Sequence, residues 1–392
     1  MPTRQTSSDN RAHIAIYGRC NAGKSTLLNF LTRSPAAIVS PHGGTTTDPV
    51  RKFFEILDFA PVVFIDTAGV DDRSPLGAER LRRTWETVEL IDMAIVVFHE
   101  WGPAEEEIAS RLRCAGTPYM AVRNVVAGAP VRPSVITPSE LFPQSHAYVD
   151  LLNGGDDARD RLMELIKSVL PELSYRPPSI FAGLASEGDA VLLVCPIDSE
   201  APTGRLILPQ VQAIRELLDA RAIAVVVQPA QIGAALCGGL TFRLVVTDSQ
   251  MFPEVQAVLP QGLPLTSFSI LLAAAKGDME LYTRGLAAID ALRDGDRVLV
   301  CESCNHQVSC EDIGRMKIPR WLGDYTGALL EFTVVSGLSP LPDDLPSYKL
   351  MLQCGGCMAT RSQLRNHIRR AAAAGVAVTN YGMAIRKIRG KK

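Results

Sequence analysis

Two short segments in the last third of the chain carry residues of the types that bind metal. VLVCESCNH places Cys301, Cys304 and His306 at the end of one apolar run, and MLQCGGCM places Cys354 and Cys357 at the end of another. Two thiolates three residues apart can bend around one ion or cluster, so a repeated Cys-x-x-Cys pair is typical of a metal site. The gap between the pairs exceeds the usual spacing of a zinc ribbon. The pattern therefore predicts a site closed by tertiary structure, with either zinc or an iron–sulfur cluster in it.

A second candidate site lies near the N-terminus, in the sequence GRCNAGKST. It follows the short apolar run HIAIY and precedes a predicted helix, so strand, loop and helix follow in the order of a Walker A phosphate-binding loop. Glycines let backbone N–H groups turn toward phosphate oxygens, and the helix N-terminus adds the positive end of its dipole. We expect Lys24 to reach the β- and γ-phosphates and the Ser25 hydroxyl to ligate Mg²⁺. The residues predicted to bind the nucleotide here are Gly18, Asn21, Ala22, Gly23, Lys24, Ser25 and Thr26.

Two further segments fit a nucleotide site of this kind. GGTTTD precedes a predicted strand and looks like a switch loop in which Thr46 offers its hydroxyl to Mg²⁺. A predicted buried strand over 61–65 ends in DTAG, which places Asp66 at its carboxyl end and Gly69 shortly after it. A carboxylate there suits a magnesium site, and the glycine N–H can approach the γ-phosphate. Lys24, Thr46 and Asp66 are therefore the predicted catalytic residues.

These three segments together resemble the translation-factor-like GTPases, in particular the subgroup with Gly-x-x-Asn-x-Gly-Lys-Ser. Asn21 matches the potassium-binding asparagine of that subgroup, so the resemblance implies K⁺ stimulation. The family reads guanine with Asn-Lys-x-Asp, whereas this chain has NVVA at 124–127, which retains Asn124 alone as a nucleotide-binding residue. No water-positioning glutamine follows DTAG. We expect phosphate binding with slow, switch-like turnover, and the guanine preference stays open.

The composition limits the class of protein. The 392 residues are 47% hydrophobic and 21% charged, with a net charge of −2, which gives no general case for nucleic-acid binding. No apolar run reaches membrane-spanning length, and no signal-peptide core precedes the first strand. Nine cysteines, an odd number in a chain of this length, favour a reducing compartment over a disulfide framework. We expect a cytoplasmic protein that binds neither nucleic acid nor membranes.

Strand and helix signals alternate along the chain, which predicts an α/β protein with a P-loop GTPase domain followed by two smaller α/β domains. The proline-rich LPELSYRPPS is typical of a linker. The predicted domains are 1–170, 178–268 and 269–392. Because ligands bind at the carboxyl ends of parallel strands, both cysteine groups are expected to meet at one edge of the last domain's sheet.

The middle domain shows no catalytic triad or metal cluster, and we expect it to serve assembly through an apolar interface. Its predicted helix from Pro209 has one apolar face, formed by Val211, Ile214, Leu217 and Leu218. In the last domain, a short helix is predicted over 287–292, followed by a turn and by the strand that leads to the first cysteines.

Motifs along nearly the whole chain resemble one family, the HydF-type GTPase that matures [FeFe]-hydrogenase. The matching stretches are GRCNAGKST, GGTTTDPV, DTAGVDD, PIDSEAPTGRLILPQ, VVTDSQ, SFSIL, KGDMELY, LRDGDRVLVCESCNH, DIGRMKIPRWL, CGGCM and TNYG. The resemblance implies a GTPase domain, a dimerisation domain and a C-terminal domain with a [4Fe–4S] cluster. It also implies a homodimeric scaffold that carries a diiron precursor and works with the radical-SAM maturases and the [FeFe]-hydrogenase apoprotein.

The cluster motif of that family is Cys-x-His, a long gap, then His-Cys-x-x-Cys. The resemblance implies Cys304, His306, Cys354 and Cys357 as metal-site residues here, with Gln353 where the second His often stands. His306 is either the fourth ligand or a neighbour. Three thiolates and one exchangeable position suit a scaffold, because a closed four-cysteine site leaves nowhere to bridge a cargo. The implied cofactors are GTP, Mg²⁺ and a [4Fe–4S] cluster.

Two other functions fit parts of the sequence. A tRNA- or ribosome-associated GTPase would use the cysteines for structural zinc. A redox enzyme would use the cluster for catalysis and keep a vestigial GTPase domain. We favour the scaffold, in which nucleotide state biases how partners dock and leave.

Overall fold

The computed structural model describes residues 11–32, 49–56, 58–124, 146–149 (backbone only), 155–176, 179–197, 206–303, 312–336 and 339–390. Three of the predicted site residues, Thr46, Cys304 and His306, lie outside these ranges. The chain divides into two units, Met1–Arg176 and Pro177–Lys392. The predicted boundary within the second unit, at residue 268, stays a prediction.

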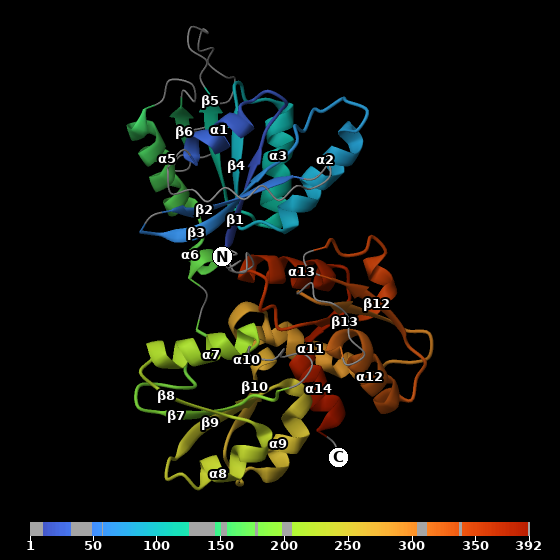
Figure 1. Ribbon diagram of the computed structural model, residues 1–392. Helices are drawn as coiled ribbons and strands as arrows, with labels where there is room; N and C mark the ends of the chain where they lie inside the picture. Colours follow the sequence, from blue (N-terminus) through green and yellow to red (C-terminus); the bar gives the residue numbers. More distant parts are fainter. Residues whose placement is uncertain are drawn as a thin grey trace. The chain divides into compact units, whose positions relative to one another are not determined.

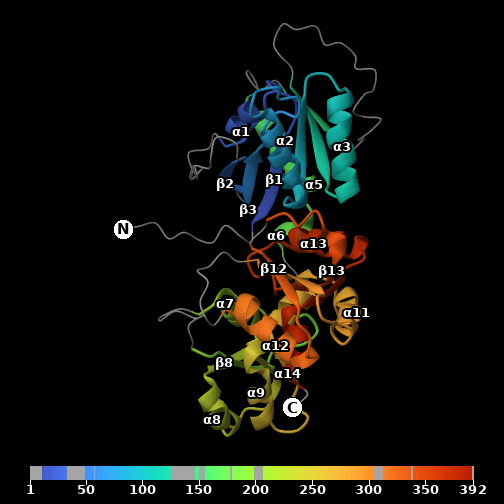
Figure 2. The ribbon, with the colours of Figure 1, turned by 90° about the vertical axis from the view of Figure 1, so that its right-hand side faces the viewer.

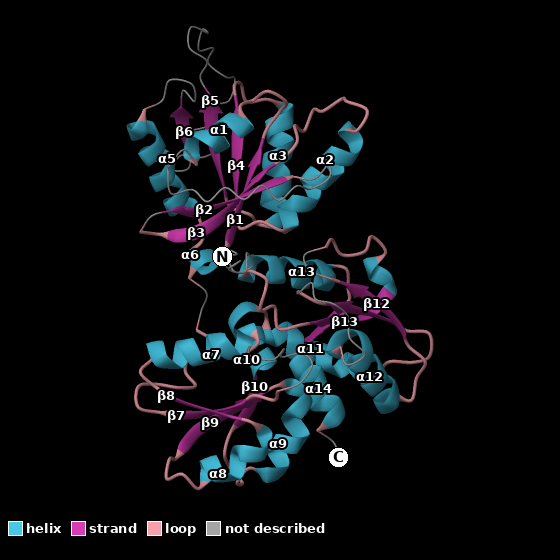
Figure 3. Cartoon of the chain, viewed as in Figure 1, coloured by secondary structure: helices cyan, strands magenta, loops and turns pink. Residues whose placement is uncertain are grey.

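The first unit contains a six-stranded sheet of order β2-β3-β1-β4-β5-β6 (Figures 1 and 3). Strand β2 is antiparallel to β3 and the other pairs are parallel. The strands are β1 (Ala12–Tyr17), β2 (Val50–Ile56), β3 (Ala60–Asp66), β4 (Met93–Phe98), β5 (Tyr119–Asn124) and β6 (His146–Val149). The helices are α1 (Lys24–Leu31), α2 (Gly77–Glu86), α3 (Pro103–Ala115), α5 (Asp156–Val169) and α6 (Glu172–Tyr175).

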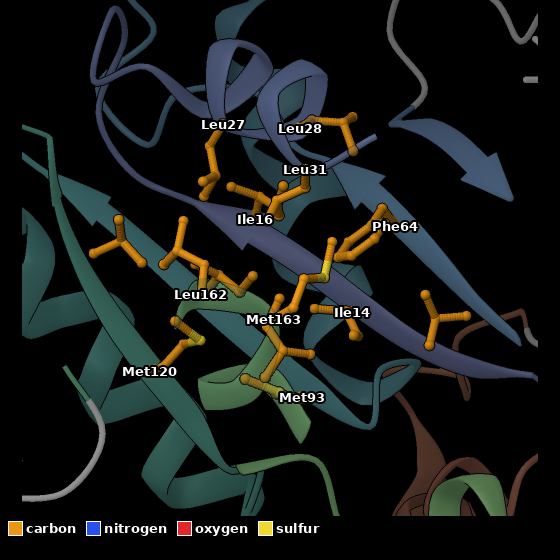
Figure 4. Packing of buried hydrophobic residues seen from close by; sticks show 14 of the residues in the cluster. Ile14, Ile16, Leu27, Leu28, Leu31, Phe64, Met93, Met120, Leu162 and Met163 are labelled. Atoms are coloured by element: carbon orange, nitrogen blue, oxygen red, sulfur yellow. The ribbon is translucent and has the colours of Figure 1, made fainter. Parts of the chain in front are cut away.

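Strand β1 is buried along its whole length, on both faces of the sheet. Ile14 and Ile16 point into a core that α1 and α5 cover, as Figure 4 shows, whereas Ala15 and Tyr17 point into a core that α3 covers. The two ribbon views show α1 and α3 on opposite sides of the sheet (Figures 1 and 2). Each buried Leu or Ile side chain contributes about 2 kcal/mol to folding. The carboxyl end of β1, where the GRCNAGKST loop begins, is therefore held firmly.

The second unit contains two four-stranded parallel sheets, of order β10-β9-β7-β8 and β12-β11-β13-β14. The strands are β7 (Ala190–Val194), β8 (Ile223–Val227), β9 (Phe242–Thr247), β10 (Leu265–Ser267), β11 (Arg297–Cys301), β12 (Glu331–Val335), β13 (Tyr348–Gln353) and β14 (Ala377–Asn380). The α-helices are α7 (Leu208–Asp219), α8 (Ile232–Leu236), α9 (Phe252–Val258), α10 (Phe268–Lys276), α11 (Met279–Ile289), α12 (Ile318–Thr326), α13 (Arg361–Ala373) and α14 (Tyr381–Arg389).

Helix α10 belongs to the cores of both sheets in this unit. Leu271 and Leu272 pack with α7 on the first sheet, and Ala273 packs in the core of the second. The Ser267 side chain caps the helix by accepting a hydrogen bond from Ile270 N. One helix therefore joins the two sheets through apolar packing.

The α/β class and the order of domains agree with the prediction. Two details of the prediction were wrong. The helix expected at 287–292 is α11, which begins earlier because the Asp278 side chain caps the N–H groups of Glu280 and Leu281. On α7 half of the predicted apolar face packs on the core, through the buried Leu217 and the partly buried Ile214, whereas Val211 and Leu218 are exposed.

None of the helices that the structure describes is both long enough and apolar enough to span a bilayer.

Helix α11 packs so closely on β14 that a Cβ at Gly285 would overlap the carbonyl oxygen of Val378. We predict that Gly285→Ala destabilises the second unit by about 2 kcal/mol, because the added methyl meets the backbone of β14, which is hydrogen-bonded to β13 and cannot give way as a flexible side chain could. Urea unfolding of the whole chain measures this. The control is Gly233→Ala in α8, where nothing lies within 4 Å of the new methyl and helix propensity favours alanine. Equal midpoints for the two variants would contradict the prediction.

Candidate functional site

The loop between β1 and α1 turns by means of three residues with positive φ. These are Gly18 (φ 154°), Asn21 (φ 61°) and Gly23 (φ 101°). A Cβ at Gly18 would overlap the carbonyl oxygen of Val97 on β4, so this position requires glycine. Gly23 is the N-cap of α1 and provides no side-chain cap, which leaves the first N–H groups of the helix facing the loop. This backbone has the shape of an anion-binding nest.

The Lys24 side chain lies across this loop and is almost fully buried. Its Nζ donates hydrogen bonds to Gly18 O at 3.2 Å and to Arg19 O at 2.8 Å. Burial lowers the pKa of Lys24, and the carboxylate of Asp66 opposes that shift. A desolvated ammonium held by backbone carbonyls at the loop is well suited to meet a phosphate.

Ser25 and Asp66 meet at the carboxyl ends of β1 and β3. Ser25 Oγ donates to Asp66 Oδ2 at 2.5 Å, and Asp66 Oδ1 is buried without a hydrogen-bond partner among the described residues. Burial raises the pKa of Asp66. A buried carboxylate oxygen without a partner, beside a hydroxyl, fits the oxygen ligands that Mg²⁺ takes.

Gly69 lies against the outside of the same loop. A Cβ at Gly69 would overlap both the thiol and the backbone nitrogen of Cys20, whose N–H donates to Asp71 Oδ1 at 2.6 Å. The segment after β3 is therefore in direct contact with the loop after β1. Thr26 is on the first turn of α1.

A second set of contacts, which sequence reasoning missed, holds the loop from outside. Arg19 Nε donates to Glu105 Oε1 at 2.8 Å, and Arg19 Nη2 donates to Glu100 O at 2.7 Å. The hydrogen bond to Glu105, whose side chain is 1% exposed, raises the pKa of Arg19. Asn124 Nδ2 donates to Ala22 O at 3.1 Å. The only sequence signal for the ion pair was a glutamate in the first turn of α3.

Cys354 lies where β13 ends, next to the end of β11. Its N–H donates to Cys301 O at 2.9 Å, and its Sγ accepts N–H groups from Ser303 at 3.0 Å and from Gly356 at 3.4 Å. Cys301 is buried, and burial raises the pKa of its thiol, so it has the surroundings of a structural cysteine. Ser303 is the last residue that the structure describes in this segment, and Cys304 follows it in the sequence.

Lys276 on α10 holds the loop that carries Cys354 and Cys357. Its Nζ donates to Gly356 O at 2.8 Å and to Ala359 O at 2.9 Å, although only 1% of the residue is exposed. Burial lowers the pKa of Lys276 to about 8 and raises the pKa of Cys357 to about 11. Hydrogen-bond donors to sulfur and a nearby cation suit a thiolate-bound cluster.

Gln353 is buried beside Cys354, and its Oε1 has no hydrogen-bond partner among the described residues. In the part of the chain that the structure describes, no three His, Cys, Asp or Glu side chains are grouped as a metal site. The described part of the cysteine site therefore consists of the Cys354 and Cys357 thiols, the N–H groups of Ser303 and Gly356 that donate to Cys354, and the Lys276 side chain that holds the loop.

We predict that Glu105→Ala weakens binding of guanine nucleotide about tenfold. The change removes the carboxylate that orients Arg19 and that accepts a hydrogen bond from the Gly102 N–H at the start of α3. A partly exposed ion pair of this kind contributes about 1–2 kcal/mol to the stability of the loop. Equilibrium titration with a fluorescent GDP measures the affinity. Glu107→Ala, which removes an exposed i,i+4 pair with Arg111, is the control and should leave affinity unchanged. Equal affinities for both variants would argue against the bracing role of Glu105.

Three sequence models of protein families match the chain. Residues 13–125 match the 50S ribosome-binding GTPase family, residues 180–277 the hydrogen maturase F dimerization domain, and residues 280–391 the hydrogen maturase F tetramerization domain. The two hydrogen maturase F models together cover more than half of the chain, and their names indicate self-association.

Two curated GTPases are similar to part of this chain. The tRNA modification GTPase MnmE of Herminiimonas arsenicoxydans is 35% identical over 163 residues, which are 39% of this chain and 34% of the relative. GTPase Era of Thermoanaerobacter sp. is 31% identical over 166 residues, which are 41% of this chain and 54% of the relative. The chain thus spans between a third and about half of the length of these relatives.

Among solved structures, an Era variant from Aquifex aeolicus bound to GDP.AlF4- is 28% identical, covers 41% of this chain and 57% of its own, and has a TM-score of 0.33. The family matches confirm the resemblance that the motifs indicated. The chain belongs to the HydF-type GTPases, with a GTPase domain followed by the dimerisation and tetramerisation domains of hydrogen maturase F.

Proposed function

We propose that this HydF-type GTPase is a scaffold that carries a [4Fe–4S] cluster and a diiron precursor and delivers the precursor to the [FeFe]-hydrogenase apoprotein, working with the radical-SAM maturases. The observation that supports this most is the convergence on Cys354 Sγ of N–H groups from Ser303 and Gly356. The segment that leads to Cys304 and the segment that carries Cys357 thus meet at one sulfur atom. Convergence of this kind is what a site closed by tertiary structure requires.

Cys304, Cys354 and Cys357 would hold the cluster, with His306 as the candidate for the remaining position. The cluster supplies an iron with an exchangeable ligand, through which a cargo can be bridged. The protein's own part is to orient the thiolates. Ser303 and Gly356 donate N–H groups to sulfur, and Lys276 fixes the Cys354–Cys357 loop from α10.

In the GTPase domain, Lys24 would bind the phosphates, Ser25 and Thr46 would ligate Mg²⁺, and Asp66 would support the ion from β3. Gly69 would offer its N–H to the γ-phosphate, and Asn124 would bind on the base side. Asn21 is the proposed K⁺ ligand, carried by the resemblance to the potassium-dependent GTPases. The main-chain N–H groups from Gly18 to Thr26 would complete the phosphate site. Nucleotide state would then bias docking and release of partners.

A second copy of the chain would pair along β8. This strand is at the edge of its sheet and contains IAVVV, with Val226 43% exposed, and the neighbouring α7 exposes Leu218 to 61%. An apolar edge strand without charges invites pairing with another strand. The region that matches a dimerization domain contains this edge. A homodimer through β8 is therefore the proposed basic assembly.

The first experiment measures iron, sulfide and zinc in anaerobically purified protein, with visible and EPR spectra. We expect about four irons and four sulfides per chain. Cys304→Ser, Cys354→Ser or Cys357→Ser should each abolish the cluster signal. Cys237→Ser, at an exposed cysteine of the same unit, should retain it. One zinc per chain without colour would mean a structural metal and would remove the support for the scaffold.

The assembly is tested by Val226→Lys, which places a charge on the apolar edge. We expect self-association to weaken at least about tenfold, because the buried ammonium costs well over 1.4 kcal/mol. Light scattering coupled to gel filtration reports the change in mass. Val258→Lys on α9, also at an exposed valine, is the control. An unchanged mass for Val226→Lys would exclude β8 as the interface.

A further inference from the structure

Positive charge is concentrated in the last part of the chain. Residues 345–392 contain ten lysines and arginines and neither aspartate nor glutamate, whereas the whole chain has a net charge of −2. The rest of the chain is therefore acidic. A separation of charge this strong indicates an anionic partner for every basic group that the fold itself does not pair.

On α14 the fold does pair the basic groups. Lys387 Nζ lies 2.6 Å from Asp290 Oδ2, and Arg389 Nη2 lies 2.9 Å from Glu254 Oε1. Both acidic residues come from earlier in the second unit, which contains α14 as well. The charge of this helix is therefore used, at least in these two places, to hold the fold together.

Helix α13 carries charges that are not paired in this way. Arg361, Arg365 and Arg369 follow one another at intervals of four residues, so they form a stripe about 12 Å long on one side of the helix. We call these three residues the α13 arginine stripe. Within the described part of the chain, none of them takes part in an ion pair. The other side of the helix, with Leu364 and Ile368, is buried in the core of the second sheet.

The stripe is unfavourable for the chain by itself. Guanidinium groups do not lose their charge in proteins, and like charges at positions i and i+4 of a helix repel each other. The Nε of Arg361 is buried and has no hydrogen-bond partner among the described residues. Burial, together with the charge of Arg365, lowers the pKa of Arg361. Uncompensated charge and an unused donor at one place are typical of a site that an anion completes.

The stripe adjoins the cysteine site. Helix α13 begins four residues after Cys357, and a Cβ at Gly356 would lie 3.0 Å from Leu364 Cδ1 of the helix. Arg365 donates hydrogen bonds from Nε and Nη2 to Gly277 O, at 3.3 and 3.2 Å. Gly277 directly follows the lysine that holds the cysteine loop. A molecule bound to the stripe would therefore lie beside the residues proposed to hold the cluster.

We propose that the α13 arginine stripe is a docking site for an acidic segment of a partner protein, whose carboxylates pair with the three guanidinium groups. Arginine presents a planar fork that matches a carboxylate, so a row of arginines fits a row of aspartates or glutamates. A nucleic acid fits less well, because its binding commonly depends on about six to ten phosphate contacts. The inference rests on the proposed scaffold function, since the partner that it describes is the protein that takes the cargo from the neighbouring cysteine site.

The first experiment measures binding of a fluorescein-labelled deca-glutamate peptide to the full chain by fluorescence anisotropy. We expect the affinity to fall between about 50 mM and about 300 mM NaCl, because salt screens exposed ion pairs. Arg361→Gln together with Arg369→Gln, the stripe variant, should weaken binding about fivefold at the lower salt, as expected for the loss of two exposed ion pairs. Arg365 is left unchanged because it also holds Gly277 O.

The matched control is Arg284→Gln together with Arg320→Gln, which gives the same net charge as the stripe variant. Each of these two exposed arginines forms an i,i+4 ion pair on its own helix, so the peptide affinity should stay within about twofold of wild type. An equal loss of affinity in both double variants would mean attraction to net charge alone and would overturn the docking site. Urea unfolding of the stripe variant should show no lower midpoint, because the change removes like charges from one helix.

Two further measurements decide what binds to the stripe. A short DNA duplex that binds more tightly than the peptide, and that the stripe variant no longer binds, would replace the acidic protein with nucleic acid. A lower mass of the stripe variant in gel filtration with light scattering would mean that the stripe joins copies of this chain. Either result would overturn the proposal.

The [FeFe]-hydrogenase apoprotein tests the link to delivery. Its association with the full chain should be about fivefold slower for the stripe variant than for wild type at about 50 mM NaCl, because complementary charge acts mainly on the association rate. Equal association rates for wild type and stripe variant would overturn the docking site and leave the scaffold function standing. Wild type without iron would overturn the scaffold function, and the peptide affinities would still decide whether the stripe binds an acidic segment.

Discussion

Burial of parallel strands on both faces is the constraint on which the rest of this structure depends. Because helices must cover both faces of such a sheet, the only places left for chemistry are the strand ends. In the first unit, β1, β3 and β5 deliver Gly18, Asp66 and Asn124 to one edge. In the second unit, β11 and β13 deliver Ser303 and Cys354 to another edge by the same rule.

The two sites differ in how their loops are kept in place. The phosphate-binding loop is held mostly by charged and polar side chains from neighbouring strand ends and from α3, such as Glu105 and Asn124. The Cys354–Cys357 loop is held by one buried lysine and by close packing, since Gly355 lies against Ser269 and Leu272 of α10. The first arrangement can respond to a ligand by exchanging hydrogen bonds. The second depends more on apolar packing and on a single buried lysine.

Much of the fold could be predicted because its signals are local. Apolar runs bounded by glycine, proline or aspartate marked the strands, and the loop between β1 and α1 has a spacing that phosphate binding dictates. What could not be predicted depends on contacts between distant residues. Glu105 is 86 positions from Arg19, and Asn124 is 102 positions from Ala22, with no periodicity to connect them. A lysine at the end of a helix, such as Lys276, is expected to be exposed to solvent, but Lys276 is buried. On α7 the apolar pattern correctly marked Leu217 and Ile214 as core residues, but it could not show that Val211 and Leu218 are exposed.

Helix α10 carries a consequence for how this protein can be dissected. Its Leu271 and Leu272 fill the core of the first sheet of the second unit, while Lys276, at its end, fastens the cysteine loop that follows β13 in the second sheet. A fragment that began after residue 268 would expose Leu271 and Leu272 to solvent. A fragment that ended at residue 268 would lose these two side chains from the core of its sheet. The two sheets of the second unit are thus joined through α10, and also through α14, whose Arg389 contacts Gln250 and Glu254 beside the first sheet. A cut between the two sheets would therefore disturb both of them.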